Sequence, residues 1–423
     1  MKGGAGTWVV AVLTAVVATV SSGAGAEVSA DAATPARKRL IVSFKDGTTA
    51  AQRAAAAREM GLTLSADLDA IDVSILEKKS PFQPEDVSRA RSNPKVLVVE
   101  EDVYRNWLLE GPSFQAAPLP SVEAALQAVA APLARAKHAA LAGGGADSSI
   151  PWGVARVDAP AAWSAGRGAG VKVAVIDTGI DCTHPDLGCD FAAGTNIVNP
   201  GARPMDDNEH GTHVSGTIAG RGVSGGPLGV APKAALIPVK VLDGDGAGSL
   251  SDIVKGIEWA TKAGVDVINM SLGGSTSSTA MERAVKAALA KGVVVVCAAG
   301  NSGPDPNTVG YPAGYPGVIA VAASDRNDDV ASFSSRGPQI AFIAPGVDIT
   351  STVPGGKTRM LSGTSMASPH VAGLAALAIE RGARGPAGVR AAFKAAASQL
   401  CAASACLPPA DEGAGLIDAA LLR

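Results

Sequence analysis

The chain has 423 residues, a formal net charge of −3 and only 4% aromatic side chains. A chain of this length has room for two or three domains. The charge balance provides no strongly basic surface, so we do not expect nucleic acid or an anionic membrane as a partner. Outside the N-terminal segment, no apolar run reaches the roughly 20 residues that a membrane-spanning helix needs.

The N-terminal segment, residues 1–26, has the pattern of a secretory signal peptide. Lys2 supplies a positive end, residues 7–20 are apolar, and residues 24–26 are small enough for cleavage. A membrane anchor is the alternative, but the apolar run is short and small polar residues follow it. We therefore expect a secreted, extracellular protein that has no membrane contact once the signal is removed.

Residues 38–107 are expected to form a small α+β domain. Strands at KRLIVSF, DVSILEKK and KVLVVEEDV alternate with helices at TTAAQRAAAAREM and PEDVSRARS. This order approximates a ferredoxin-like fold. Residues 108–146 are rich in Ala, Pro and Gly, which is typical of a linker.

From residue 147 to residue 423, buried strands alternate with amphipathic helices. The runs VKVAVID, DVINMSL, GVVVVCAAG and GVIAVAAS are almost wholly apolar, as strands covered on both faces are. One helix is expected to begin near Ser251, and another with a capping box formed by Thr279 and Glu282. The alternation predicts an α/β fold with a doubly wound parallel sheet, whose sites lie at the carboxyl ends of the strands.

The five cysteines leave one without an intramolecular partner if the chain is exported. Cys182 and Cys189 flank one short loop, and Cys401 and Cys406 flank another, so each pair is a candidate disulfide, with free thiols as the alternative. Cys297 lies in an apolar strand and is expected to be a small core residue. No pair of CxxC motifs is present, so we do not expect zinc.

Three polar residues in distant motifs provide the parts of an activated nucleophile. Ser365 stands at a helix start in LSGTSMASPH, where a serine needs no function beyond capping the helix. A serine attacks only when a base takes its proton, and an imidazole base needs an acceptor on its other nitrogen. His210 in DDNEHGTH can be the base, and Asp177 at the end of VKVAVID the acceptor. Asp, His, Ser is one of the known chain orders of this triad.

His210 and His213 could instead form a metal-binding pair. The zinc helix of metalloproteases has two histidines four residues apart with a glutamate between them. The segment HGTH has neither that spacing nor that glutamate. We therefore expect His210 to act as a base.

Together, the motifs VAVIDTGIDCTHPDL, HGTHVSGTIAG, NMSLGG, AAGN and GTSMASPHVAG resemble those of the subtilisin-like serine proteases. The similarity covers residues 147–423, and residues 38–107 resemble the inhibitory propeptide of that family. The resemblance implies a secreted serine endopeptidase, made as a zymogen, that acts as a monomer on protein or peptide substrates. It implies no cofactor for the chemistry itself.

The resemblance also implies binding roles. Asn301 in AAGN is similar to the amide that, with the backbone N–H of Ser365, stabilises the oxyanion of the tetrahedral intermediate. Two extended segments are expected to pair with the substrate backbone. A glycine at the base of the main side-chain pocket is expected to leave room for large apolar side chains. The substrate-binding residues assigned in this way are Ser271, Leu272, Gly273, Gly246, Ala247, Gly248 and Gly310.

One position departs from the family pattern. The family's calcium site uses an aspartate after the first motif, here Asp186, and a loop that here reads RGVSGGPLG. Val223 stands where related proteins carry a side-chain oxygen ligand, and calcium needs six to eight oxygens. The sequence therefore leaves a structural calcium ion at Asp186 as an open alternative.

Two other functions fit parts of the pattern. An inactive binding protein with the same fold would not need the triad and Asn301 together. An esterase could use the same triad, but the propeptide-like domain and the backbone-pairing segments favour peptides. We expect residues 38–107 to help the peptidase domain to fold, to place residues 104–109 in the substrate groove, and to be removed by Ser365 itself.

Overall fold

The computed structural model describes residues 39–108, 150–402 and 405–422. The expected signal peptide, residues 1–26, lies outside these residues. So does the expected linker, residues 108–146, apart from Leu108.

Residues 39–101 form a small domain with one four-stranded antiparallel sheet in the order β2-β3-β1-β4. With its two helices, this is the expected ferredoxin-like arrangement. The sequence analysis missed β2, a strand with mostly exposed or half-buried side chains. The elements are β1 (Arg39–Phe44), α1 (Ala50–Glu59), β2 (Thr63–Leu68), β3 (Val73–Glu77), α2 (Pro84–Ser92) and β4 (Val96–Glu101).

The central strands of the small domain, β1 and β3, are buried on both faces of the sheet. On one face, Leu40 and Phe44 of β1 pack in a cluster with Met60 and with residues of α1 and α2. On the other face, Ile41 and Ile75 belong to a larger cluster that includes side chains of the α/β domain. The period-2 alternation of β1 therefore gives the small domain its own core on one side and a docking face on the other.

The α/β domain is built on a nine-stranded sheet in the order β16-β19-β13-β12-β11-β10-β6-β8-β7. Every neighbouring pair is parallel except β16 with β19. Along the chain, β7 and β8 are placed on one side of β6, and the strands from β10 onward on the other side. The strand order therefore reverses between β6 and β10. The strands are β6 (Lys172–Asp177), β7 (Thr195–Asn196), β8 (Ala235–Lys240), β10 (Val267–Met270), β11 (Val294–Ala298), β12 (Ile319–Ser324), β13 (Ile340–Pro345), β16 (Ala397–Ser398) and β19 (Leu416–Ile417).

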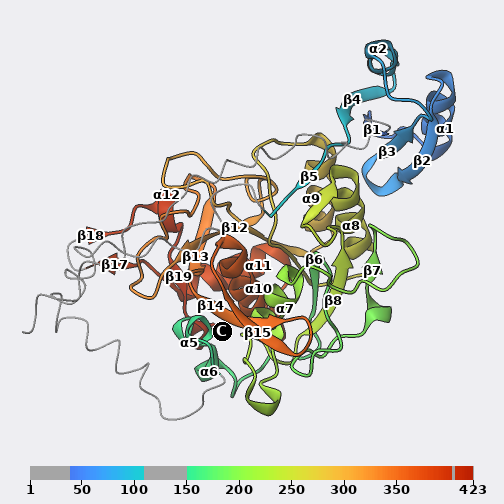
Figure 1. Ribbon diagram of the computed structural model, residues 1–423. Coiled ribbons are helices and arrows are strands. Elements are labelled where there is room, and N and C mark those ends of the chain that lie inside the picture. The colour runs from blue at the N-terminus through green and yellow to red at the C-terminus, as the bar shows by residue number, and fades with distance from the viewer. Residues whose placement is uncertain (1–38, 109–149, 403–404, 423) are drawn as a thin grey trace, which may run out of the picture. The chain divides into compact units, whose positions relative to one another are not determined.

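Helices cover both faces of this sheet (Figure 1). Val173 and Val175 of β6 pack in a core with side chains of α7 (His210–Ala219), α10 (Thr364–Glu380) and α11 (Gly385–Ala396). The alternate β6 residues, Ala174 and Ile176, pack with α8 (Leu250–Lys262) and α9 (Thr279–Ala290). The prediction of a doubly wound parallel sheet after a ferredoxin-like domain is confirmed.

Shorter elements complete the described part of the chain. A hairpin of β14 (Ile349–Val353) and β15 (Lys357–Leu361) packs against α7, and β5 (Tyr104–Asn106) pairs with β9 (Ala247–Ser249). The remaining elements are α5 (Trp152–Arg156), α6 (Ala159–Ala162), α12 (Pro409–Glu412), β17 (Cys401–Ala402), β18 (Ala405–Cys406) and four single-turn 3₁₀ helices, η1 (Asp69–Ile71), η2 (Phe191–Ala193), η3 (Val223–Gly225) and η4 (Ala419–Leu421).

Cys182 and Cys189 form a disulfide with an S–S distance of 2.05 Å. The backbones of Cys401 and Cys406 are paired in register between β17 and β18, and Cys406 is disulfide-bonded. The side chain of Cys401 lies outside the described part of the chain. Cys297 is a free, buried thiol in β11, as the sequence analysis expected.

The start of α9 differs from the sequence-based expectation. Its N-cap is Ser278, whose hydroxyl accepts the N–H of Met281 at 3.2 Å, so the capping box at Thr279 and Glu282 is wrong by one residue. Thr279 is already inside the helix, and its N–H donates instead to the carboxylate of Glu100 at 2.9 Å. A residue of the small domain therefore completes this helix terminus.

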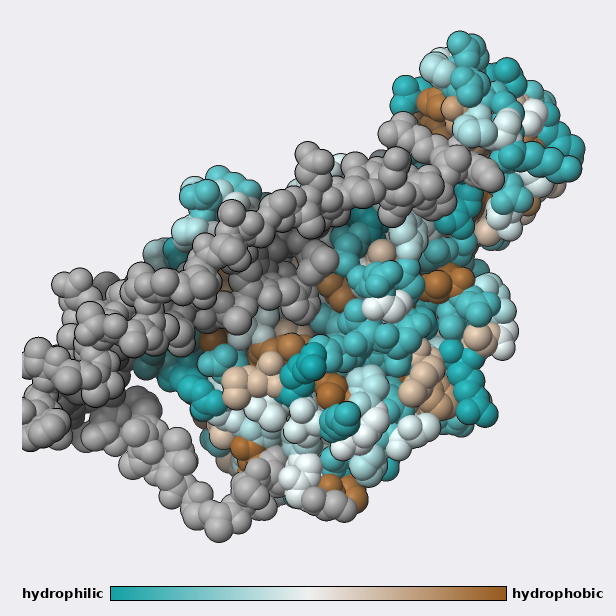
Figure 2. All heavy atoms as spheres, viewed as in Figure 1, coloured by the Kyte–Doolittle hydropathy of each residue, from teal (hydrophilic) through white to brown (hydrophobic). Residues whose placement is uncertain are grey.

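On the face shown in Figure 2, hydrophobic residues form separate small patches between hydrophilic ones. The most exposed large apolar side chains are Met360, Leu97 and Leu421, at 55%, 52% and 52%. Among the helices of residues 39–108, 150–402 and 405–422, none has the length and apolar character needed to cross a membrane.

Candidate active site

Asp177 and His210 meet at the carboxyl end of β6. Oδ1 of Asp177 lies 2.8 Å from Nδ1 of His210, and both side chains are buried, with exposures of 0% and 2%. Nε2 of His210 is buried without a hydrogen-bond partner among the described residues. The pair therefore has one nitrogen held by a carboxylate and the other open to a proton donor, which is the geometry of an oriented base.

The close approach of α7 to β6 explains why glycine follows His210. A Cβ on Gly211 would lie 2.1 Å from the carbonyl oxygen of Gly179, so any other residue would push the helix away from the strand end. Its N–H also donates to the hydroxyl of Thr178 at 2.9 Å. Gly211 thereby brings His210, the first residue of α7, within reach of Asp177.

Asp206 holds the same helix start, and the sequence analysis missed it. This buried carboxylate accepts the hydroxyl of Thr178 at 2.9 Å, the N–H of Glu209 at 3.1 Å and the N–H of Thr212 at 2.9 Å. It thus ties the turn after β6 to the first turn of α7. The acidic segment DDNE before His210 was the available signal, but sequence alone does not show which acid is buried.

The pKa of His210 is raised above its ordinary value. Burial favours the neutral imidazole, but the adjacent Asp177 carboxylate outweighs it, with smaller contributions from Asp206 and Glu209. A raised pKa means that the imidazolium is well stabilised once His210 has taken a proton. It also means that His210 becomes a free base only above its usual titration range.

His213 does not share a metal site with His210. Its Nε2 lies 2.9 Å from the carbonyl oxygen of Ile349 and 3.2 Å from that of Arg359, in the β14–β15 hairpin. Burial, and then the charge of His210, lowers the pKa of His213 to about 3. Nowhere in the described part of the chain do three or more His, Cys, Asp or Glu side chains lie close enough together to hold a metal ion.

Ser365 is the second residue of α10, after the N-cap Gly363, so the helix-capping interpretation of this serine is wrong. Its Oγ donates to the carbonyl oxygen of Ser271 at 3.0 Å, and the Ser271 hydroxyl donates back to the carbonyl oxygen of Ser365 at 2.8 Å. These reciprocal bonds join α10 to the carboxyl end of β10. The hydroxyl of Ser365 therefore points at Ser271 in this structure and has to rotate to reach an imidazole.

A buried polar chain behind this contact was not found from sequence. Ser368 donates to Oδ1 of Asn269 at 2.8 Å, and Nδ2 of Asn269 donates to the Ser271 hydroxyl at 3.0 Å. All three residues are fully buried. The signal was an asparagine inside the apolar strand VINM, because a buried amide needs partners.

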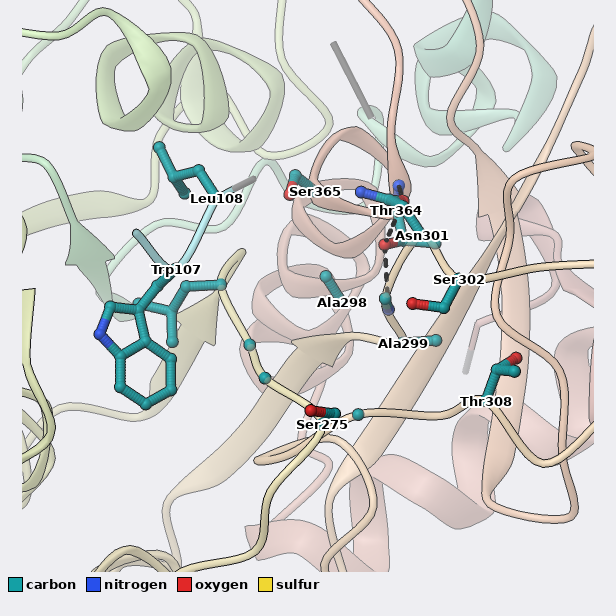
Figure 3. A pocket seen from close by; sticks show the side chains of 15 residues that line it. Trp107, Leu108, Ser275, Ala298, Ala299, Asn301, Ser302, Thr308, Thr364 and Ser365 are labelled. Atoms are coloured by element: carbon teal, nitrogen blue, oxygen red, sulfur yellow. Dashed lines mark hydrogen bonds between the residues drawn. The ribbon is translucent and has the colours of Figure 1, made fainter. Parts of the chain in front are cut away.

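Asn301 follows β11, and its amide is held at the Oδ1 end. Its Oδ1 accepts both the N–H and the hydroxyl of Thr364, each at 2.9 Å, which fixes the orientation of the amide (Figure 3). Its Nδ2 lies 3.7 Å from the position that a Cβ on Gly363 would take, and the N–H of Ser365 lies 3.6 Å from that same position. Two donors are therefore set next to each other at the start of α10.

One predicted substrate segment lines a pocket together with the tail of the small domain, residues 103–108. Leu272, Gly273, Asn301 and Ser365 line this pocket together with Trp107 and Leu108 (Figure 3). Gly273 donates its N–H to the carbonyl oxygen of Trp107 at 3.3 Å. On the other side, Gly246, Ala247 and Gly248 pair with residues 105–107.

Gly310 lies in the wall of the same pocket, beside Ala298 and Ala299. Its N–H donates to the carbonyl oxygen of Ala299 at 2.9 Å, and a Cβ on it would meet the carbonyl oxygen of Gly274 at 3.0 Å. A side chain at this position would therefore press on Gly274 as well as fill the pocket.

Asp186 does not by itself make a calcium site. Its carboxylate is buried, its Oδ1 has no partner among the described residues, and its Oδ2 lies 4.0 Å from Nδ1 of His184. One carboxylate falls well short of the six to eight oxygens that calcium takes. Val223, in the facing loop, is exposed and supplies no side-chain oxygen. Further oxygens would have to come from backbone carbonyls, so a calcium ion at Asp186 stays a prediction.

The chain matches the model of the subtilase family over residues 168–407. It is 52% identical over 237 residues to the protein "Subtilisin" of Bacillus pumilus, a match that covers 55% of this chain and 86% of the relative. The chain belongs to the subtilase family.

Other subtilases give matches of the same size. Subtilisin E of Bacillus subtilis (strain 168) is 52% identical over 237 residues, which is 55% of this chain and 62% of that relative. Subtilisin BL of Lederbergia lenta is 51% identical over 230 residues, which is 54% of this chain and 84% of the relative. The match thus spans less than two thirds of Subtilisin E.

Proposed function

We propose that this subtilase is a secreted serine endopeptidase, made as a zymogen and acting as a monomer. The observation that carries the proposal is the 2.8 Å bond between the buried Asp177 and His210, with the second imidazole nitrogen left open. An orienting carboxylate, an imidazole and a serine hydroxyl at a helix start are the parts of an acyl-transfer site.

In the proposed reaction, Oγ of Ser365 attacks the peptide carbonyl carbon while Nε2 of His210 takes the hydroxyl proton. The tetrahedral intermediate collapses, the peptide C–N bond breaks, and His210 passes the proton to the leaving amine. Water then attacks the acyl-enzyme, with His210 again taking and returning one proton. Asp177 keeps the imidazole in one tautomer and stabilises its charged form.

The bond of Ser365 to Ser271 is consistent with this role. Catalytic hydrogen bonds in unliganded sites are often long or poorly aligned and tighten only when substrate binds. A rotation about the Cα–Cβ bond of Ser365 moves its hydroxyl from the Ser271 carbonyl towards His210. A substrate strand that pairs with residues 271–273 would favour this rotation by competing for the Ser271 carbonyl.

We assign Nδ2 of Asn301 and the N–H of Ser365 as the two donors that stabilise the oxyanion. Both donors are fixed before the reaction, since Thr364 occupies the other end of the Asn301 amide. Donors that meet charge only in the transition state lower the barrier without tightening substrate binding. Each step uses groups of the chain itself, so we propose that the chemistry needs no cofactor.

Zymogen formation is inferred from the tail of the small domain. Trp107 and Leu108 already line the pocket that would take the substrate, so the tail would exclude other peptides. Self-cleavage by Ser365, either near Leu108 or nearer Asp147, and export through residues 1–26 belong to the same proposal. The glycine at position 310 supports broad specificity that favours large apolar side chains.

Hydrolysis of casein and of a matched peptide amide and ester tests the proposal. Wild type should cleave all three, and a serine-directed phosphonyl inhibitor should stop it. Ser365→Ala should be inactive and remain unprocessed, whereas Ser362→Ala, three residues earlier in the chain, should behave as wild type. Ester cleavage without amide cleavage would instead identify an esterase, and binding without any cleavage an inactive binding protein.

A further inference from the structure

The turn before β9 carries two aspartates that the proposed reaction does not use. Oδ1 of Asp243 accepts the N–H of Asp245 at 2.9 Å and the N–H of Ala247 at 3.0 Å, which fixes this carboxylate at the entrance of β9. Its second oxygen, Oδ2, accepts the hydroxyl of Tyr104 in the tail. The aspartate therefore presents one free oxygen to whatever side chain lies in the place of Tyr104.

The register of the tail on β9 determines which residue that is. Tyr104 stands opposite Ser249 and Asn106 opposite Ala247, in an antiparallel pair. The ladder continues with the N–H of Leu250 donating to the carbonyl oxygen of Val103 at 2.9 Å. A peptide that replaces the tail uses the same backbone donors and acceptors, so its side chains fall at the same places.

Alternate tail residues point to the same turn. Nδ2 of Asn106 donates to the carbonyl oxygen of Asp245 at 2.5 Å, two residues after Tyr104 reaches Asp243. Side chains two apart on a strand share a face. This turn therefore contacts side chains of the bound strand as well as its backbone.

The surroundings of Tyr104 are negatively charged. Burial first, and then the carboxylates of Asp243, Asp245 and Asp252, raise the pKa of Tyr104 to about 12. Asp252 is neutralised by Lys255 at 3.1 Å, whereas no lysine or arginine of the described residues forms an ion pair with Asp243 or Asp245. A cation in this place would meet two uncompensated carboxylates.

We propose that Asp243 is a specificity-determining residue that selects peptides with a lysine, arginine or tyrosine in the place of Tyr104. This place lies three residues before the one that Trp107 fills. The inference rests on the proposed peptidase function and names the substrate class that this turn selects. Lysine and arginine offer a cation, tyrosine a hydrogen bond to a carboxylate, phenylalanine neither, and glutamate is repelled.

The first test uses fluorogenic peptides with the sequence of residues 102–112, in which tyrosine at position 104 is kept or replaced by lysine, arginine, phenylalanine or glutamate. The activated enzyme should give a kcat/KM about tenfold higher for lysine or arginine than for glutamate. The expected ratio is no larger because a half-exposed contact to a charged group contributes less free energy than a buried one. Equal rates for lysine and glutamate would overturn the proposal.

Two enzyme variants locate the effect. Asp243→Asn keeps the Oδ1 acceptor for the turn but removes the charge, and should reduce the preference for lysine over glutamate to less than about twofold. Asp245→Asn is the matched control, with the same change of charge in the same turn, and should keep most of the preference. An equal loss in both variants would contradict the assignment to Asp243.

A second measurement does not depend on hydrolysis. In the full chain with Ser365→Ala, hydrogen exchange of the backbone N–H groups of residues 103–107 reports how firmly the tail is held. Tyr104→Glu should speed this exchange about fivefold or more and Tyr104→Lys should not, and Asp243→Asn should remove the difference. If no peptide is hydrolysed, the proposed peptidase function fails, and the exchange rates alone test whether Asp243 selects the residue in the place of Tyr104. Equal exchange in Tyr104→Glu and Tyr104→Lys would overturn this role of Asp243.

Discussion

The catalytic centre and the contacts of the tail differ in how deeply their polar groups are buried. Asp177, His210 and Asn301 are 0%, 2% and 6% exposed. In the tail, Tyr104 is 45% exposed, and in the small domain the side chain of Asp46, which pairs with Arg283, is 92% exposed. A buried polar group that loses its partner costs far more free energy than an exposed one. The polar contacts at Tyr104 and Asp46 therefore cost less free energy to break than those of the centre, as the proposed release of the small domain requires.

The strongest test of the centre is to remove its members one at a time and together. Ser365→Ala and His210→Ala should each lower kcat by about 10⁶-fold, and the double variant should be scarcely slower, because the two act as one unit. This magnitude is the one known from a subtilisin, a relative of this chain. Single-turnover rates on a peptide amide give the measurement. Losses that multiply in the double variant would show that the two residues act separately.

The oxyanion donor should have the next largest effect. Asn301→Ala should lower kcat by about 10²- to 10³-fold with little change in KM, since the amide meets charge only in the transition state. That range also comes from a subtilisin. Steady-state kinetics separate the two constants. An increase in KM at constant kcat would place Asn301 in substrate binding instead.

Among the residues of the α/β domain that contact the small domain, Arg283 of α9 should have the largest effect on its binding. Its guanidinium donates to the carbonyl oxygens of Phe44 at 2.9 Å and Ile71 at 3.1 Å, and it pairs with Asp46 at 2.9 Å. Arg283→Ala should weaken binding of the small domain by about tenfold or more, because several hydrogen bonds to one charge are lost.

Hydrogen exchange of residues 39–101 in the full chain with Ser365→Ala measures this weakening. Lys286→Ala is the matched control, since Lys286 lies on the same helix and pairs only with Glu282 at 2.8 Å among the described residues. Equal exchange in the two variants would mean that the apolar face, and not Arg283, holds the small domain.

The smallest predicted effect lies where an exposed pair adjoins the buried centre. Glu209, immediately before His210, forms an ion pair with Arg359 and raises the pKa of His210. Hydrolysis needs the neutral imidazole, so the rate increases as the pH rises through this pKa. Glu209→Gln should shift that increase to lower pH, and Arg359→Gln to higher pH.

The pH dependence of kcat/KM in low salt gives the measurement, and 1 M salt should reduce both shifts because the pair is exposed. Two variants that shift the profile in the same direction would contradict the electrostatic explanation.

Burial also explains what the sequence could predict. The sequence predicted the apolar strands, because a buried parallel sheet needs continuous apolar runs. It also singled out Asp177, His210, Asn301 and Ser365, because a triad and its oxyanion donor need particular residue types. The polar strand β2 was not predicted, since its alternation of apolar and polar residues is weak. Asp206 and Asn269 were missed because their role depends on partners from distant segments. Sequence shows which residues are polar, but only the fold shows which of them are buried together.

The fluorescence of Trp107 reports whether the tail occupies the pocket. Its indole is 4% exposed, donates to the carbonyl oxygen of Gly248 at 2.9 Å, and has the guanidinium of Arg105 4.0 Å from its ring centroid. When the tail leaves, this ring passes from an apolar pocket into water, and indole emission shifts to longer wavelength on such a change. The proposed release of the tail can therefore be followed in real time without a dye, with Trp107→Phe supplying the background from Trp152, Trp163 and Trp259.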